Sequence, residues 1–237
     1  MLQRIFISTG IILLAACLRF WQIGSAPSAL NYDEALNGLV SSQILNGEHP
    51  GLLALEDSRE PLHFYLTAIS LSVFGNTPGS LRLPYVMCSL ILVGIVGLLA
   101  RELFDRKIGW LTAMLCACTV WPMYLGRYGT RSVVFALIIA LAIYFAVRAL
   151  GRRNLSIWIA AGLCFGVSHY TYTVNLFVIP AIIFIVVGMV ILCHKTIVTN
   201  WRGILVMISI TVVVALPILA YRSDLLVHSF SRPRSLS

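Results

Sequence analysis

The chain has 237 residues, of which 59% are hydrophobic and 11% charged, and its mean hydropathy is +0.91. Soluble domains carry about 25% charged and about 45–50% apolar residues, so this composition excludes an ordinary soluble protein and indicates an all-α, polytopic membrane protein. The formal net charge of +8 does not indicate nucleic-acid binding, because Lys and Arg gather in the cytoplasmic loops of membrane proteins.

Long apolar segments predict about seven transmembrane helices, because an apolar stretch of about 20 residues crosses a bilayer core of about 30 Å. The first segment is long for a signal peptide and is interrupted by Arg19, so we expect an uncleaved helix. The predicted spans are 5–23, 80–100, 108–125, 131–149, 155–169, 174–193 and 203–221.

Basic residues predict the orientation, because they concentrate in cytoplasmic loops. Their placement puts the N-terminus in the cytoplasm of a cell-membrane protein and leaves 24–79, 126–131 and 169–173 outside. The residues assigned to the cytoplasm are Arg4, Arg101, Arg106, Lys107, Arg148, Arg152, Arg153, Lys195 and Arg202.

The first outer loop, 24–79, is much longer than the others and carries two helical patterns. Apolar residues recur at helical spacing from Leu36 to Ile44, and Gly47 is suited to end that helix. A second pattern begins at Pro61, a residue that fits the first helical turn. We expect two interfacial helices that form a structured outer lid, because long loops in compact proteins are usually functional.

Two adjacent acids, Asp33 and Glu34, open the first of these helices. Asn31 can cap the helix with Glu34 at the third position, which is a capping-box arrangement. Asp33 is not needed for that box. The alternative for the pair is catalytic, since a carboxylate can accept the proton of an attacking hydroxyl.

Three arginines, Arg82, Arg127 and Arg131, lie at the outer ends of predicted spans, against the usual charge distribution. Arg127 and Arg131 are four residues apart and would share one face of a continuous helix. Their side chains either extend to lipid headgroups or form a pocket for a phosphate, which the planar guanidinium fork suits.

Two further groups of residues are open to both structural and functional interpretation. Arg59, Glu60 and His63 surround the start of the second lid helix, where capping explains part of the pattern. Tyr170 and Tyr172 interrupt the apolar run between the fifth and sixth spans, either as an interfacial aromatic belt or as the lining of an outer cavity.

The sequence contains no pattern of metal ligands and no nucleotide-binding motif, so we expect no cofactor. Its six cysteines all fall in apolar segments, none in a CxxC pair, and are interpreted as buried hydrophobic residues. A divalent ion would be compatible with Asp33 beside a phosphate, but no ligand spacing supports one.

Several segments carry a family resemblance through their order and outer placement. They are Tyr32-Asp33-Glu34, Glu60-Pro61-Leu62-His63-Phe64-Tyr65-Leu66, Arg82-Leu83-Pro84, Gly126-Arg127-Tyr128-Gly129-Thr130-Arg131 and Gly166-Val167-Ser168-His169-Tyr170-Thr171-Tyr172-Thr173. Together they resemble the GT-C superfamily, and within it the family 39-like group of protein O-mannosyltransferases and aminoarabinose transferases.

The resemblance implies transfer of a sugar from a polyprenyl-phosphate donor to a hydroxyl of a protein, lipid or glycan, on the outer face of the membrane. It implies that Asp33 is the catalytic base, supported by Glu34. It also implies that basic residues of the lid and outer helix ends hold the donor phosphate. The candidates are Arg59, Arg82, Arg127 and Arg131.

The chain departs from this group in two ways. Glu60-Pro61-Leu62 stands where relatives often have Lys-Pro-Pro, so the phosphate contact there would move to Arg59 or be absent. Relatives usually have further spans and often a soluble outer domain, so residues 1–237 are expected to be a single N-terminal transmembrane module, as a fragment, a truncated product or part of a split enzyme. A non-catalytic membrane module and a lipid or sugar transporter are the competing functions.

Overall fold

The computed structural model describes residues 2–48, 60–152, 154–172 and 194–231, and within them the fold is all-α. The helices are α1 (Leu2–Phe20), α2 (Tyr32–Leu45), α3 (Leu62–Phe74), α4 (Pro78–Leu103), α5 (Arg106–Cys118), α6 (Val120–Arg127), α7 (Arg131–Arg152), α8 (Leu155–Ser168) and α10 (His194–Ser231). The two expected lid helices are therefore present as α2 and α3, and Gly75, with a φ of 78°, follows the end of α3.

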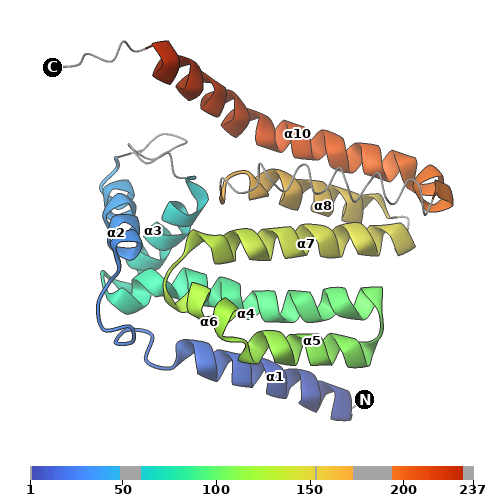
Figure 1. Ribbon diagram of the computed structural model, residues 1–237, viewed down its shortest axis with the longest axis horizontal. Helices are drawn as coiled ribbons and strands as arrows, with labels where there is room; N and C mark the ends of the chain where they lie inside the picture. The colour runs from blue at the N-terminus through green and yellow to red at the C-terminus, as the bar shows by residue number, and fades with distance from the viewer. Residues whose placement is uncertain (1, 49–59, 153, 173–193, 232–237) are drawn as a thin grey trace.

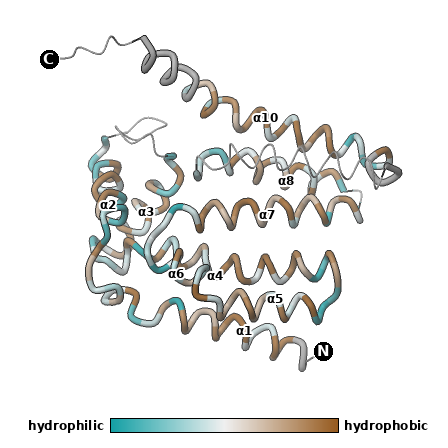
Figure 2. Tube along the Cα trace, in the orientation of Figure 1, coloured by the Kyte–Doolittle hydropathy of each residue, from teal (hydrophilic) through white to brown (hydrophobic). Residues whose placement is uncertain are grey.

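The long helices lie side by side, and α2, α3 and α6 gather at one end of the bundle (Figure 1). Contacts run from α1 to α5, from α5 to α4, and then through α7 and α8 to α10. One apolar core joins α4 to α7 around Tyr85 and Val133. A second joins α1, α4 and α5 around Ala15 and Val93. One end of the bundle is built from α2, α3 and the α6–α7 turn, and hydrophilic positions lie there beside hydrophobic ones (Figure 2).

Three helical segments in the described residues are long and apolar enough to cross a membrane: Pro78–Leu103, Arg131–Arg152 and Val198–Tyr221. Helices α5 and α6 together form a fourth if the bend between them is allowed. α1 and α8 are shorter apolar helices, and the predicted span 174–193 lies outside the described residues. The described part of the chain thus has three or four candidate spans, and seven are not shown.

The predicted third span, 108–125, is not one continuous helix. It breaks at Thr119 into α5 and α6, which are bent by 53°. Pro122 explains the break, because proline has no N–H and its ring clashes with the carbonyl four residues earlier, at Cys118. The bend directs α6 toward the end of the bundle that carries α2.

Arg19 fastens α1 to the bundle although it lies in an apolar segment. Its side chain is fully buried and donates to the Ser89 hydroxyl, and to the carbonyls of Cys116 and Ala117 at the end of α5. A cation at a helix C-terminus is favourable, because the carbonyls there carry partial negative charge. This anchor fixes where the chain leaves α1 on its way to α2.

Candidate active site

A small cavity of about 150 Å³ lies at the end of the bundle that carries α2. It is enclosed by the first turns of α2, by the turn between α6 and α7, and by the chain just after α8. The lining residues are Asp33, Asn37, Gly129, Thr130, Arg131, Ser132 and Tyr172. Three residues selected from the sequence, Asp33, Arg131 and Tyr172, are thereby brought together from distant parts of the chain.

Asp33 is the acid that faces this cavity. It lies in the first turn of α2 and its side chain is exposed. Asp33 is therefore a solvent-accessible acid that lines the cavity.

Glu34 has a structural position. The Asn31 side chain accepts from the Glu34 N–H at 2.8 Å, and the Asn31 N–H donates to Glu34 Oε2 at 3.0 Å. These two bonds form the predicted capping box. Glu34 is also fully buried and pairs with Arg82 Nε at 2.7 Å. The cap and the ion pair together hold the start of α2 beside α4.

Arg82 is committed to protein partners. It makes five hydrogen bonds: two to Glu34, and one each to the carbonyls of Ile23, Pro27 and Ala29. Its side chain is fully buried. A guanidinium has about five N–H donors, so none is left for a phosphate. The structure therefore does not support the expected contact between Arg82 and the donor phosphate. The three carbonyl contacts indicate that Arg82 holds the 23–29 loop in place.

Arg127 and Arg131 do not share a helix face, contrary to the prediction. Arg127 ends α6 and Arg131 begins α7, with a turn between them. Arg127 donates to the carbonyls of Leu18, Trp21 and Ala26, so it binds the end of α1 and the following loop. Only Arg131 of the two lines the cavity.

Gly129 shapes the turn that separates them. Its φ of +59° lies in the left-handed region, which side chains disfavour. A Cβ there would come 3.3 Å from Glu34 Cγ, so the turn packs closely on α2. Its carbonyl accepts from Asn37 Nδ2 at 3.3 Å. The turn thus places Arg131 next to the helix that carries Asp33.

Replacing Gly129 with Ala is expected to lower protein stability by about 1–2 kcal/mol, because a left-handed conformation with a Cβ costs roughly that amount. The measurement is the thermal unfolding midpoint of the full chain in detergent. Gly151→Ala is the matched control, since Gly151 lies in α7 and a Cβ there would meet no atom within 4 Å. Equal midpoints for the two variants would contradict this account of the turn.

Arg131 is held from two sides and remains partly open. Its Nη1 donates to Glu60 Oε2 at 3.1 Å, and its guanidinium lies over the Tyr172 ring at 4.9 Å. The Glu60 side chain is fully buried, whereas the Arg131 side chain is 27% exposed. Glu60 thus acts on the cavity by holding Arg131. The remaining N–H donors of the Arg131 guanidinium can bind an anion.

Asn37 is a cavity residue that the sequence analysis missed. It lies four residues after Asp33, so the two share one helix face, and this spacing was the available signal. Its Nδ2 donates to the Tyr85 hydroxyl at 3.2 Å. Its buried Oδ1 has no hydrogen-bond partner among the described residues. A buried acceptor without a partner is costly, and a ligand hydroxyl would satisfy it.

The other selected residues that the structure describes do not line this cavity. His63 is fully buried in α3 with its ring 4.0 Å from that of Phe64. Tyr170 donates its hydroxyl to the Val214 carbonyl of α10 at 2.9 Å and, unlike Tyr172, does not line this cavity. Arg59 lies outside the described residues. Among the described residues, no group of three or more His, Cys, Asp or Glu could hold a metal ion.

Comparison with known proteins identifies the family. The model of the dolichyl-phosphate-mannose-protein mannosyltransferase family matches residues 49–221, which is more than half of the chain. The matched range contains Glu60, Arg131 and Tyr172 and begins after Asp33. No curated protein and no solved structure matches the chain. The chain belongs to the dolichyl-phosphate-mannose-protein mannosyltransferase family, a group of membrane glycosyltransferases.

Proposed function

We propose that the chain transfers a sugar from a polyprenyl-phosphate donor to a hydroxyl acceptor, and that the reaction takes place at the cavity between α2 and the α6–α7 turn. The observation that supports this most directly is that one small cavity is lined by both an exposed acid, Asp33, and a partly exposed guanidinium, that of Arg131. The reaction needs both, since a proton must be removed and an anion must leave.

The proposed chemistry assigns one task to each charged group. The acceptor oxygen bonds to the anomeric carbon of the sugar as the bond from that carbon to the phosphate oxygen breaks. Asp33 takes the acceptor proton as general base. Arg131 stabilises the negative charge that develops on the departing polyprenyl phosphate. Asn37 Oδ1 accepts a hydrogen bond from a sugar or acceptor hydroxyl.

The surrounding residues would keep these groups in place. In this proposal, Glu34 and Arg82 fix the N-terminus of α2, which holds Asp33. Glu60 and Tyr172 orient the Arg131 guanidinium. Such support has a large effect on rate, because a small misplacement of a reacting group is costly. Mannose is the first sugar to test, since the family is named for a dolichyl-phosphate-mannose donor.

The membrane arrangement in this proposal follows the charge distribution. We assign the cavity to the outer face, with about seven spans and a cytoplasmic N-terminus, because the basic loops lie toward the other end of the helices. The polyprenyl tail would lie against the apolar helix surfaces, where large side chains such as Val213 and Leu216 of α10 are exposed. Lipid contact accounts for that exposure.

Arg131→Gln provides the test that is specific to the donor. We expect kcat/KM for polyprenyl-phosphate mannose to fall about 10- to 100-fold, because hydrogen bonds to charged groups contribute roughly 1.5–3 kcal/mol. The assay follows labelled mannose from the lipid donor into hydroxyl acceptors in membranes that contain the full chain. Arg131→Lys, which retains the charge but not the planar fork, should lose less.

Arg152→Gln is the matched control, since Arg152 is an exposed arginine at the opposite end of the same helix. It should transfer at the wild-type rate. If Arg131→Gln left the donor KM and kcat unchanged, the phosphate would have to bind elsewhere. If the wild-type chain moved no label from any donor sugar, the non-catalytic membrane module would replace the enzyme as the function.

A further inference from the structure

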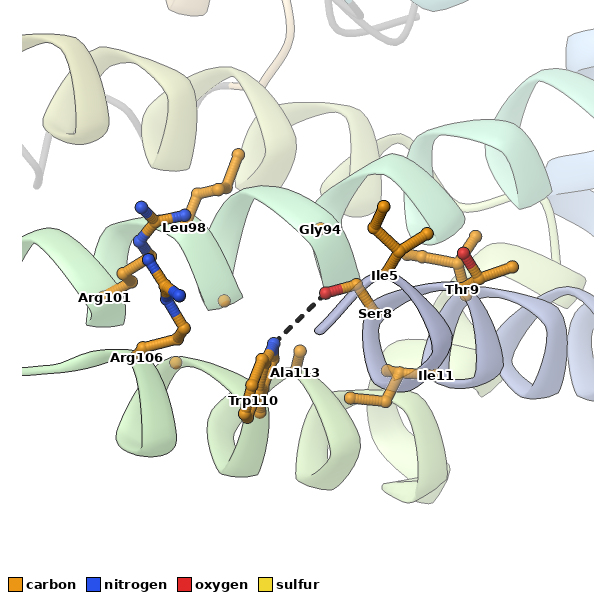
Figure 3. A pocket seen from close by; sticks show the side chains of 13 residues that line it. Ile5, Ser8, Thr9, Ile11, Gly94, Leu98, Arg101, Arg106, Trp110 and Ala113 are labelled. Atoms are coloured by element: carbon orange, nitrogen blue, oxygen red, sulfur yellow. Dashed lines mark hydrogen bonds between the residues drawn. The ribbon is translucent and has the colours of Figure 1, made fainter. Parts of the chain in front are cut away.

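A second and larger cavity, of about 490 Å³, lies at the opposite end of the bundle and is not used by the proposed reaction. It is an open groove between α1, the second half of α4 and the first half of α5 (Figure 3). Its walls are mainly apolar, with side chains such as Ile5, Ile12 and Leu98. Its length runs along the helices, which suits a chain-like apolar ligand.

Glycine residues create the room. A Cβ at Gly94 would meet only Ile12 Cδ1, at 3.9 Å, so the space above Gly94 is nearly open. Further along, α4 and α5 approach so closely that a Cβ at Gly97 would come 2.8 Å from Ala113 Cβ. Small residues allow this backbone approach. The groove therefore has a floor of helix backbone rather than of side chains.

Two arginines, Arg101 and Arg106, lie at one end of the groove (Figure 3). Arg101 belongs to the last turn of α4, and Arg106 is the first residue of α5. Neither makes an ion pair or a hydrogen bond with any residue of the described ranges. The neighbouring acid Asp105 caps α5, its carboxylate accepting from the Ile108 N–H at 2.8 Å.

Two positive charges on one groove repel each other, and an anion between them would lower that cost. Trp110 also lines the groove. Its Nε1 donates to the Ser8 hydroxyl of α1 at 3.1 Å, across the groove (Figure 3). Tryptophan is enriched at the depth of the lipid headgroups, where an apolar ring and a polar N–H are both accommodated.

We propose that this groove binds an anionic glycerophospholipid, with an acyl chain against the apolar walls and the phosphate between Arg101 and Arg106. Basic pockets between transmembrane helices are suited to anionic headgroups. The arginines lie at the end that the charge distribution assigns to the cytoplasm, the side on which anionic lipids gather. A zwitterionic lipid fits less well, because its ammonium would lie near two guanidinium groups.

Lipid retention by the full chain tests the proposal without any transfer reaction. The protein is purified in detergent, titrated with phosphatidylglycerol, phosphatidylcholine or inorganic phosphate, and examined by native mass spectrometry. We expect phosphatidylglycerol to be retained at concentrations where phosphatidylcholine is not. Arg101→Gln and Arg106→Gln should each weaken its binding about fivefold, since a basic residue near an anionic lipid surface contributes roughly that factor.

Gly94→Leu separates the acyl-chain site from the charges. It fills the groove and leaves both arginines in place, so it should also reduce retention, and an unchanged thermal midpoint would show that it folds. Arg152→Gln, an exposed arginine at the same end of the bundle but outside the groove, should change nothing. Unaltered phosphatidylglycerol binding in the Arg101→Gln, Arg106→Gln double variant would overturn the proposal. So would equal retention of phosphatidylcholine, or binding of inorganic phosphate with no effect of added lipid.

Discussion

Replacing Asp33 with Asn is expected to lower the rate constant of sugar transfer, kcat, by about 10²- to 10⁴-fold, the usual contribution of a general base. Asn has the same shape as Asp but cannot take a proton from the acceptor hydroxyl. Asp33 is exposed and outside the capping box, so the variant should fold. The measurement is label transfer at saturating donor and acceptor, together with the thermal midpoint of the same preparation.

Glu48→Gln is the matched control for this change. Glu48 is an exposed acid just beyond the other end of α2 and does not line the cavity. Removing its charge should leave kcat within about twofold of wild type, since it contacts no reacting group. Transfer by Asp33→Asn at the wild-type rate would exclude Asp33 as the base. A fall in both kcat and the midpoint would instead indicate that Asp33 maintains the fold of α2.

Local features of the site could be predicted from the sequence. The capping box of Asn31 and Glu34 depends on residues three apart in one helix, and the structure confirms it. The Thr77 cap of α4 is of the same local kind, with its hydroxyl accepting from the Ser80 N–H at 3.1 Å. In each case the donor and acceptor are fixed by local backbone geometry, which short patterns describe well.

Long-range partners could not be predicted in the same way. Arg82, Arg127 and Arg131 have the same residue type and similar placement at span ends. Only the folded chain shows that the first two bind loop and helix carbonyls. These carbonyls lie more than 50 residues away in sequence, so no local pattern marks them. Arg131 differs because the turn at Gly129 rotates it toward α2.

The membrane spans show the same difference between features that depend on local sequence and features that depend on packing. Apolar length identified α4 and α7 well, because each is a continuous helix. The prediction of the third span as a single helix was wrong, because the helix breaks near Pro122. Whether a proline breaks a helix in an apolar segment depends on how the chain packs around it. A common cavity was one of the two interpretations of Tyr170 and Tyr172, and the structure instead shows the Tyr170 hydroxyl bound to α10. Residues two apart after a helix end need not point in the same direction.

The ion pair of Glu34 and Arg82 is expected to be among the most sensitive points of the fold. Arg82→Gln should lower the free energy of unfolding by about 3–5 kcal/mol, because it leaves the Glu34 carboxylate buried without its cation. Glu34→Gln should be similarly costly, although Gln at the third position can still complete the capping box. The measurement is the thermal midpoint and the fraction of monodisperse protein in detergent.

The double variant Glu34→Gln, Arg82→Gln distinguishes a structural pair from a phosphate site. With both charges removed, no uncompensated ion remains, so the loss of stability should be smaller than the sum of the single losses by about 0.5–3 kcal/mol. If Arg82 instead held the donor phosphate, Arg82→Gln would fold normally and raise the donor KM. That outcome would support a phosphate-binding role for Arg82. It would also contradict the structural role of its guanidinium, which holds the 23–29 loop against α4 through three carbonyls.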